Sequence, residues 1–77
     1  MTVLELNKGQ FAVITKLKSS DLKLKLIEMG FYKGNIVEFL FKAPFGDPIA
    51  LSVNGYVISL RKEEAELVEV ELLIKKC

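Results

Sequence analysis

Residues 49–60 read IALSVNGYVISL, and this stretch decides the fold. From residue 49 to residue 53, apolar residues alternate with small or polar ones, which is the period of a strand with one buried face. Asn54-Gly55 follows, and this pair favours a type I′ turn because both central residues of that turn need a positive φ. The stretch therefore predicts a β-hairpin whose return strand covers residues 56–60.

Three further strands are predicted on either side of this hairpin, because residues 11–17, 36–42 and 68–72 have the same period of two. The faces expected to be buried are Phe11, Val13 and Leu17 in the first strand, Val37, Phe39 and Phe41 in the second, and Val68, Val70 and Leu72 in the third.

Two segments do not follow the strand period and predict helices. Residues 21–29 place apolar residues at i, i+4 and i+7, which predicts a helix of two to three turns. Ser20 is positioned to cap its start, and Gly30 to end it in a left-handed conformation. Residues 61–65 have good helix formers but room for about one turn, so they predict a short helical connector.

These elements predict a mainly β fold: a small, partly closed barrel of about five strands, with one short inserted α-helix and a helical turn before the last strand. A length of 77 residues predicts a single domain over 1–77. Its core is expected over about 4–72, with 73–77 as a tail. The apolar residues 72–74 either extend an edge strand into a dimer or finish the core, so a monomer and a weak dimer both stay open.

The composition argues against catalysis and metal binding. The chain has no His, which is the commonest acid-base group near neutral pH and the commonest metal ligand. Its one cysteine, Cys77, is the last residue and has no intrachain partner. No Gly-rich phosphate loop is present. We therefore expect no enzyme activity, no catalytic residue, no metal ligand and no cofactor.

The charge and hydropathy indicate where the chain acts. The formal net charge is +1, so we expect no nucleic-acid partner. The distribution is uneven, since residues 8–42 carry an excess of four positive charges and residues 61–71 an excess of three negative ones. No apolar run reaches the roughly 18 residues of a membrane span, and the start does not resemble a signal peptide. We expect a cytoplasmic protein without direct membrane insertion.

The residues expected to contact a partner lie beside turns or carry a hard-to-replace charge. They are Met29, Phe31, Pro44, Phe45, Asp47 and Arg61. Core packing is the competing interpretation for Met29 and Phe31. Phe45 lies in a Pro-Phe-Gly-Asp-Pro turn with few neighbours to cover it. Arg61 is the only arginine, and either contacts a partner or pairs with a glutamate such as Glu63 or Glu64.

Three stretches stand in a distinctive order and spacing: LIEMGF at 26–31, APFGDPI at 43–49 and ISLRKEEA at 58–65. Together with residues 4–9, Ile14, Lys33-Gly34, Val68 and Val70, they resemble the FeoA family. The resemblance covers roughly residues 4–70, and its most specific parts are the GDPI loop and the ISLRKEEA segment.

The resemblance implies an SH3-like barrel and a small cytosolic accessory protein of bacterial ferrous iron uptake. The expected partner is the cytoplasmic part of FeoB, a membrane transporter with a GTP-binding domain, on which the chain would act as a protein-binding module. The family is commonly labelled as transition-metal associated. Two alternatives stay open: a regulator of the transporter's GTP hydrolysis, with Arg61 as an arginine finger, and a metal-associated regulatory domain like that of DtxR-type repressors.

Overall fold

A computed structural model describes residues 1–73 of the chain. Ile74 and Cys77, which belong to the expected tail, lie outside the described residues. The elements in chain order are η1 (Val3–Glu5), β1 (Phe11–Leu17), α1 (Lys23–Glu28), β2 (Ile36–Lys42), η2 (Pro44–Gly46), β3 (Ile49–Val53), β4 (Tyr56–Leu60), α2 (Lys62–Ala65) and β5 (Val68–Leu73).

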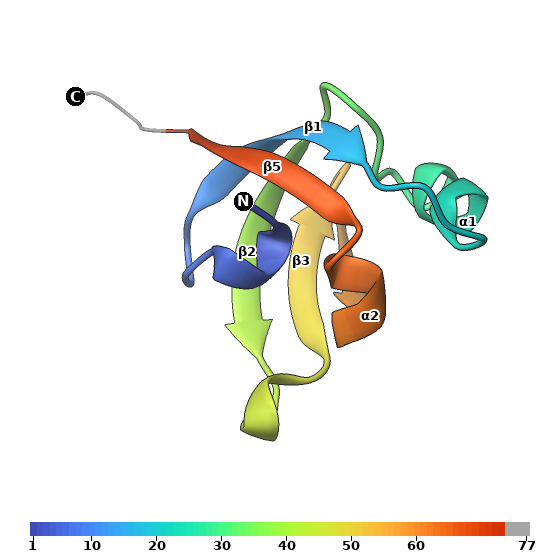
Figure 1. Ribbon diagram of the computed structural model, residues 1–77. Coiled ribbons are helices and arrows are strands. Elements are labelled where there is room, and N and C mark those ends of the chain that lie inside the picture. Colours follow the sequence, from blue (N-terminus) through green and yellow to red (C-terminus); the bar gives the residue numbers. More distant parts are fainter. Residues whose placement is uncertain (74–77) are drawn as a thin grey trace.

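The five strands form one antiparallel sheet in the order β4-β3-β2-β1-β5. The sheet curves so that β1 and β5 run across the direction of β2 and β3 (Figure 1). Its two edge strands, β4 and β5, do not pair with each other, so the barrel is only partly closed. The N-terminal segment covers the edge of β5, where the Val70 N–H donates to the Met1 carbonyl at 2.8 Å. The predicted mainly β class with five strands and small helices is confirmed.

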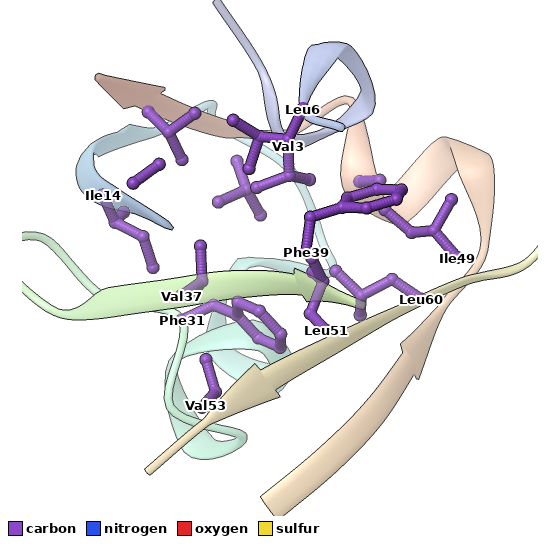
Figure 2. Packing of buried hydrophobic residues seen from close by; sticks show 14 of the residues in the cluster. Val3, Leu6, Ile14, Phe31, Val37, Phe39, Ile49, Leu51, Val53 and Leu60 are labelled. Atoms are coloured by element: carbon purple, nitrogen blue, oxygen red, sulfur yellow. The ribbon is translucent and has the colours of Figure 1, made fainter. Parts of the chain in front are cut away.

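The core lies on the concave side of the sheet and is closed by η1, α1 and α2. Its largest fully buried side chains come from the five strands, η1, α1 and the loops after η1 and α1, and α2 adds Ala65; they include Val3, Leu6, Ile14, Leu26, Phe31, Val37, Phe39, Ile49, Leu51, Val53, Leu60 and Val68. Figure 2 shows Phe31 beside Val37 of β2 and Val53 of β3, and Phe39 of β2 beside Ile49 of β3 and Leu60 of β4. An apolar cluster of this kind supplies most of the stability of so short a chain.

The hairpin that the sequence predicted is present. Val53 pairs with Tyr56, and the register continues to Ile49 opposite Leu60. Asn54 and Gly55 between them have φ values of 52° and 83°. Both central residues are thus in the left-handed region that a type I′ turn requires.

The predicted buried face of β1 is wrong for Phe11 and Val13. Ala12 and Ile14 are buried instead, whereas Phe11 is 44% exposed. The reason is a β-bulge between Ile14 and Lys16, which inserts one residue into the alternation. Leu17 lies inside as predicted, but it shares the inner face with even-numbered residues upstream of the bulge.

The predicted face of β2 is right for Val37 and Phe39 and wrong for Phe41. A second register shift, between Phe39 and Phe41, moves Phe41 to the outside of the sheet, where it is 55% exposed. In β5 the alternation is uninterrupted, and Val68 and Val70 are buried as predicted.

The inserted helix α1 ends as predicted, in a left-handed glycine. Gly30 has a φ of 105° and donates its N–H to Ile27, while the Phe31 N–H donates to the Leu26 carbonyl at 2.9 Å. These two bonds define a Schellman motif, which satisfies carbonyls at the helix end. The helix starts two residues later than predicted, at Lys23, and its N-cap is Leu22, so the predicted Ser20 cap is wrong; the Ser20 hydroxyl accepts from the Leu22 N–H at 3.1 Å in the turn before the helix. The motif turns Phe31 inward beside Leu26.

Candidate functional site

The loop between β2 and β3 carries the most exposed aromatic side chain of the described residues. Phe45 has a φ of 70° and a ψ of 6°, and its relative accessibility is 106%. A non-glycine residue in this left-handed region costs roughly 1–3 kcal/mol. A ring that is fully exposed recovers none of this through burial within its own chain. The fold alone therefore does not benefit from an aromatic residue at this position.

Three hydrogen bonds nevertheless hold this loop in place. The Gly46 N–H donates to the Ala43 carbonyl at 2.8 Å, and the Ala43 N–H donates to the Pro48 carbonyl at 2.9 Å. The carboxylate Oδ1 of Asp47 accepts from the Lys62 N–H at 3.1 Å, which ties the loop to the first turn of α2. Because the backbone is already ordered, binding through this loop loses less conformational entropy.

Glu64 connects the two helices near the loop. Its Oε1 accepts from the Arg61 N–H at 2.9 Å, at the start of α2, and its Oε2 lies 2.8 Å from the Lys25 Nζ of α1. The hydrogen bond from Lys25, followed by the bond from the Arg61 backbone, lowers the pKa of Glu64, against the opposing effect of burial. Glu64 is thus an ionised, buried structural link.

A polar hollow of about 460 Å³, here called the arginine hollow, lies between the loop, the end of β4 and the two helices. Its lining residues are Lys25, Asp47, Pro48, Ser59, Arg61 and Glu64. Two of the residues predicted as partner contacts, Asp47 and Arg61, meet here although they are far apart in the sequence. Pro44 and Phe45 lie on the adjoining loop and are exposed.

Arg61 contacts Glu64 through its backbone N–H, but its guanidinium does not form the alternative ion pair with Glu63 or Glu64. Within residues 1–73 the only ion pair is Lys25–Glu64. Both oxygens of the Glu64 carboxylate are occupied, one by the backbone of Arg61 and the other by Lys25. The exposed Arg61 guanidinium forms no ion pair in this part of the chain, although its charge contributes to the lowered pKa of Glu64, and it lines the arginine hollow.

The prediction that Phe31 is a surface contact is contradicted, because its side chain is fully buried. The Schellman motif after α1 directs it into the core, and the competing core interpretation holds. Met29 is only partly buried and packs against the core from the end of α1.

The sequence interpretation missed Lys25, Ser59 and Glu64 as lining residues. Glu64 had a local signal, since it stands three residues after the start of a helical turn, where an acidic side chain commonly caps. Lys25 had none, because its carboxylate partner lies 39 positions away along the chain.

Residues 1–73 hold no group of three or more His, Cys, Asp or Glu side chains that could bind a metal ion. Over the same residues, no helix is long and apolar enough to cross a membrane.

A family model, a curated relative and solved structures all match this chain to the same family. The FeoA domain model matches residues 1–72. A Porphyromonas gingivalis protein, described as an Fe(2+) transport protein A/Fe(2+) transporter FeoB fusion protein, is 35% identical over 74 residues, which are 95% of this chain. The chain spans only 9% of that protein's length.

Solved structures agree with this. Iron(II) transport protein A from Clostridium thermocellum has a TM-score of 0.89 at 42% identity, covering 95% of this chain and 46% of that one. Stenotrophomonas maltophilia FeoA, crystallised with zinc and described as a prokaryotic SH3 domain protein, has a TM-score of 0.81 at 32% identity, covering 92% and 89%.

Proposed function

This chain belongs to the FeoA family, which is involved in ferrous iron transport, and we propose that it is a protein-binding module that docks on the cytoplasmic part of a FeoB-type transporter. Its docking surface comprises the loop around Phe45 and the adjoining arginine hollow. It acts as an adaptor without chemistry of its own.

The fusion relative supports this choice of partner. That protein is described as a fusion of Fe(2+) transport protein A with the transporter FeoB, and 95% of this chain aligns with part of it. Fusion holds two modules at a high effective concentration, which is useful when they act on one another.

The exposure of Phe45 is the single observation on which the proposed docking surface rests. It is a fully exposed aromatic ring at a positive φ, on a loop that hydrogen bonds hold in place. Burying a Phe side chain contributes about 1.5–3 kcal/mol, and aromatic anchors of this kind dominate many interfaces. The exposed Arg61 guanidinium nearby, which forms no ion pair within residues 1–73, suits a carboxylate or another planar acceptor on the partner.

The test is a titration against the full-length FeoB-type transporter in phosphatidylcholine nanodiscs. We expect Phe45→Ser to weaken binding about 10-fold to 100-fold, the equivalent of the lost burial. Tyr56→Ser is the matched control, since Tyr56 is also an exposed aromatic residue, 72% exposed, but lies at the other end of the sheet beside the hairpin turn. Equal effects of the two substitutions, or no binding by the unchanged chain, would contradict the proposal.

A second candidate function is regulation of the transporter's GTP hydrolysis, and the exposed Arg61 guanidinium, which forms no ion pair within residues 1–73, favours it. An arginine supplied by a partner stabilises the charge that develops in phosphoryl transfer. Arg61→Lys keeps the charge but loses the planar fork. If Arg61 acts on GTP, this variant lowers stimulated hydrolysis at least tenfold while docking persists. Hydrolysis that is unaffected by adding the unchanged chain would exclude this function.

A further inference from the structure

A second hollow, here called the basic hollow, lies between the end of β1 and α1 and has a volume of about 440 Å³. It is lined by Lys16 from β1, Lys23 from α1 and Lys33 from the turn that follows α1. Ile27 and Tyr32 also line it and are 38% and 43% exposed. A hollow that both lysines and apolar side chains line suits a ligand that is both acidic and apolar.

The lysines of the basic hollow form no ion pair within residues 1–73. None of its residues is acidic, and the one ion pair in residues 1–73 joins Lys25 to Glu64, in the arginine hollow. Glu69 stands opposite Lys16 in the β1–β5 register, yet the two side chains form no ion pair. The chain has a net charge of only +1, so this is a local concentration of charge rather than a general property of the surface.

Backbone hydrogen bonds hold one wall of the basic hollow against β1. The Gly34 N–H donates to the Ile14 carbonyl at 2.7 Å, and the Ile14 N–H donates to the Asn35 carbonyl at 2.8 Å. The Asn35 N–H closes the turn onto the Tyr32 carbonyl at 3.1 Å. Tyr32 and Lys33 are therefore presented from an ordered turn, and only their side chains lose freedom on binding.

We propose that the basic hollow binds an acidic segment of the docking partner, with carboxylates against the lysines and one apolar side chain on Ile27 and Tyr32. This inference rests on the proposed function and adds a second contact to it. We choose an acidic segment because its charge complements that of the three lysines. A small inorganic anion would leave the apolar side chains of Ile27 and Tyr32 without a contact.

Two other occupants fit these features less well. Nucleic acid usually selects a basic excess over a whole surface, and this chain has nearly balanced charges. A lipid surface is bound by long amphipathic helices or flat basic patches, whereas α1 has six residues and the lysines surround a concavity.

The experiment compares two double variants by their binding kinetics on the full-length transporter in phosphatidylcholine nanodiscs. Lys23→Gln/Lys33→Gln removes two charges from the basic hollow. Lys8→Gln/Lys42→Gln removes the same charge from a different part of the surface. We expect the first pair to slow association and to weaken binding about tenfold at low salt, and the control pair to change it less than twofold. The difference should disappear at high salt.

Each outcome decides between the proposals. If both double variants bind equally well while Phe45→Ser still weakens binding, the acidic-segment inference fails and the proposed function stands. If the unchanged chain does not bind the transporter, both fail. Empty nanodiscs with phosphatidylserine and a single-stranded RNA serve as further probes. If either binds the unchanged chain as tightly as the transporter does, and with the same dependence on Lys23 and Lys33, the basic hollow is a lipid or nucleic-acid site and the inference is overturned.

Discussion

Gly30→Ala perturbs the contact between α1 and the β3–β4 hairpin. Gly30 is buried and has a φ of 105°. A Cβ atom added there would lie 2.5 Å from the Val53 Cγ1 and 3.0 Å from the Asn54 Nδ2. The Val53 side chain is part of the packed core, so it has little room to move away.

The expected loss of stability has two parts. A positive φ at a residue with a Cβ costs about 1–2 kcal/mol. Forcing a methyl group into packed core side chains costs a further ~1–3 kcal/mol. The sum of about 2–5 kcal/mol is a large fraction of the free energy of unfolding of a chain of this size, for which roughly 0.05–0.15 kcal/mol per residue is usual.

Gly34→Ala provides the matched control, because Gly34 has a φ of 93° but no atom within 4 Å of an added Cβ. We expect it to lose only the backbone part, about 1–2 kcal/mol. Urea unfolding of both variants, at unchanged m-value, measures the difference. Equal losses for Gly30→Ala and Gly34→Ala would refute the steric argument, and an unaffected Gly34→Ala would refute the backbone argument.

Two further predictions concern the polar contacts around the arginine hollow. Glu64→Gln should lower the free energy of unfolding by about 1–3 kcal/mol at neutral pH, because it removes a charged partner of Lys25. Since folding lowers the pKa of Glu64, its ionised form stabilises the fold above the ordinary value of 4.5, and this contribution is lost as the pH falls through the lowered value. Urea unfolding at several pH values should therefore show a smaller loss on acidification for Glu64→Gln than for the unchanged chain; parallel pH profiles would contradict this. Asp47→Ala should cost about 0.5–1.5 kcal/mol by removing the bond to the Lys62 N–H, and should weaken transporter binding although Phe45 is intact. Unchanged binding would show that this bond does not organise the loop.

The parts of the fold that could be predicted are those with local signals. Asn54-Gly55 specifies its turn by the conformations of two adjacent residues, and Gly30 specifies the end of α1 in the same way. Neither depends on distant partners, so the sequence was sufficient for both.

The faces of β1 and β2 could not be predicted, because a bulge is a property of two paired strands. The shift at Thr15 moves the buried face of β1 to Ala12 and Ile14, and the shift near Leu40 exposes Phe41. A period of two read along one strand contains no information about an inserted residue.

The candidate site was predicted in part, for the same physical reason. The exposure of Phe45 followed from its own turn. The ion pair of Glu64 with Lys25 did not, because the two residues lie 39 positions apart in the sequence. Residues that are neighbours in the sequence do not always form the ion pair, because a residue from another element, here Lys25, can lie closer to the carboxylate.

The short helix α1 connects the two proposed contact surfaces. Lys25 lines the arginine hollow, whereas Lys23 and Ile27 line the basic hollow. Residues 23 and 27 are four apart and share a helix face, while residue 25 points to the other side. Leu24 lies between the two lysines and is 66% exposed. We expect a partner that occupies both hollows to cross α1 near Leu24, which with Ile27 is one of two exposed apolar residues of this helix, so that the proposed interface continues from the basic hollow to the loop around Phe45.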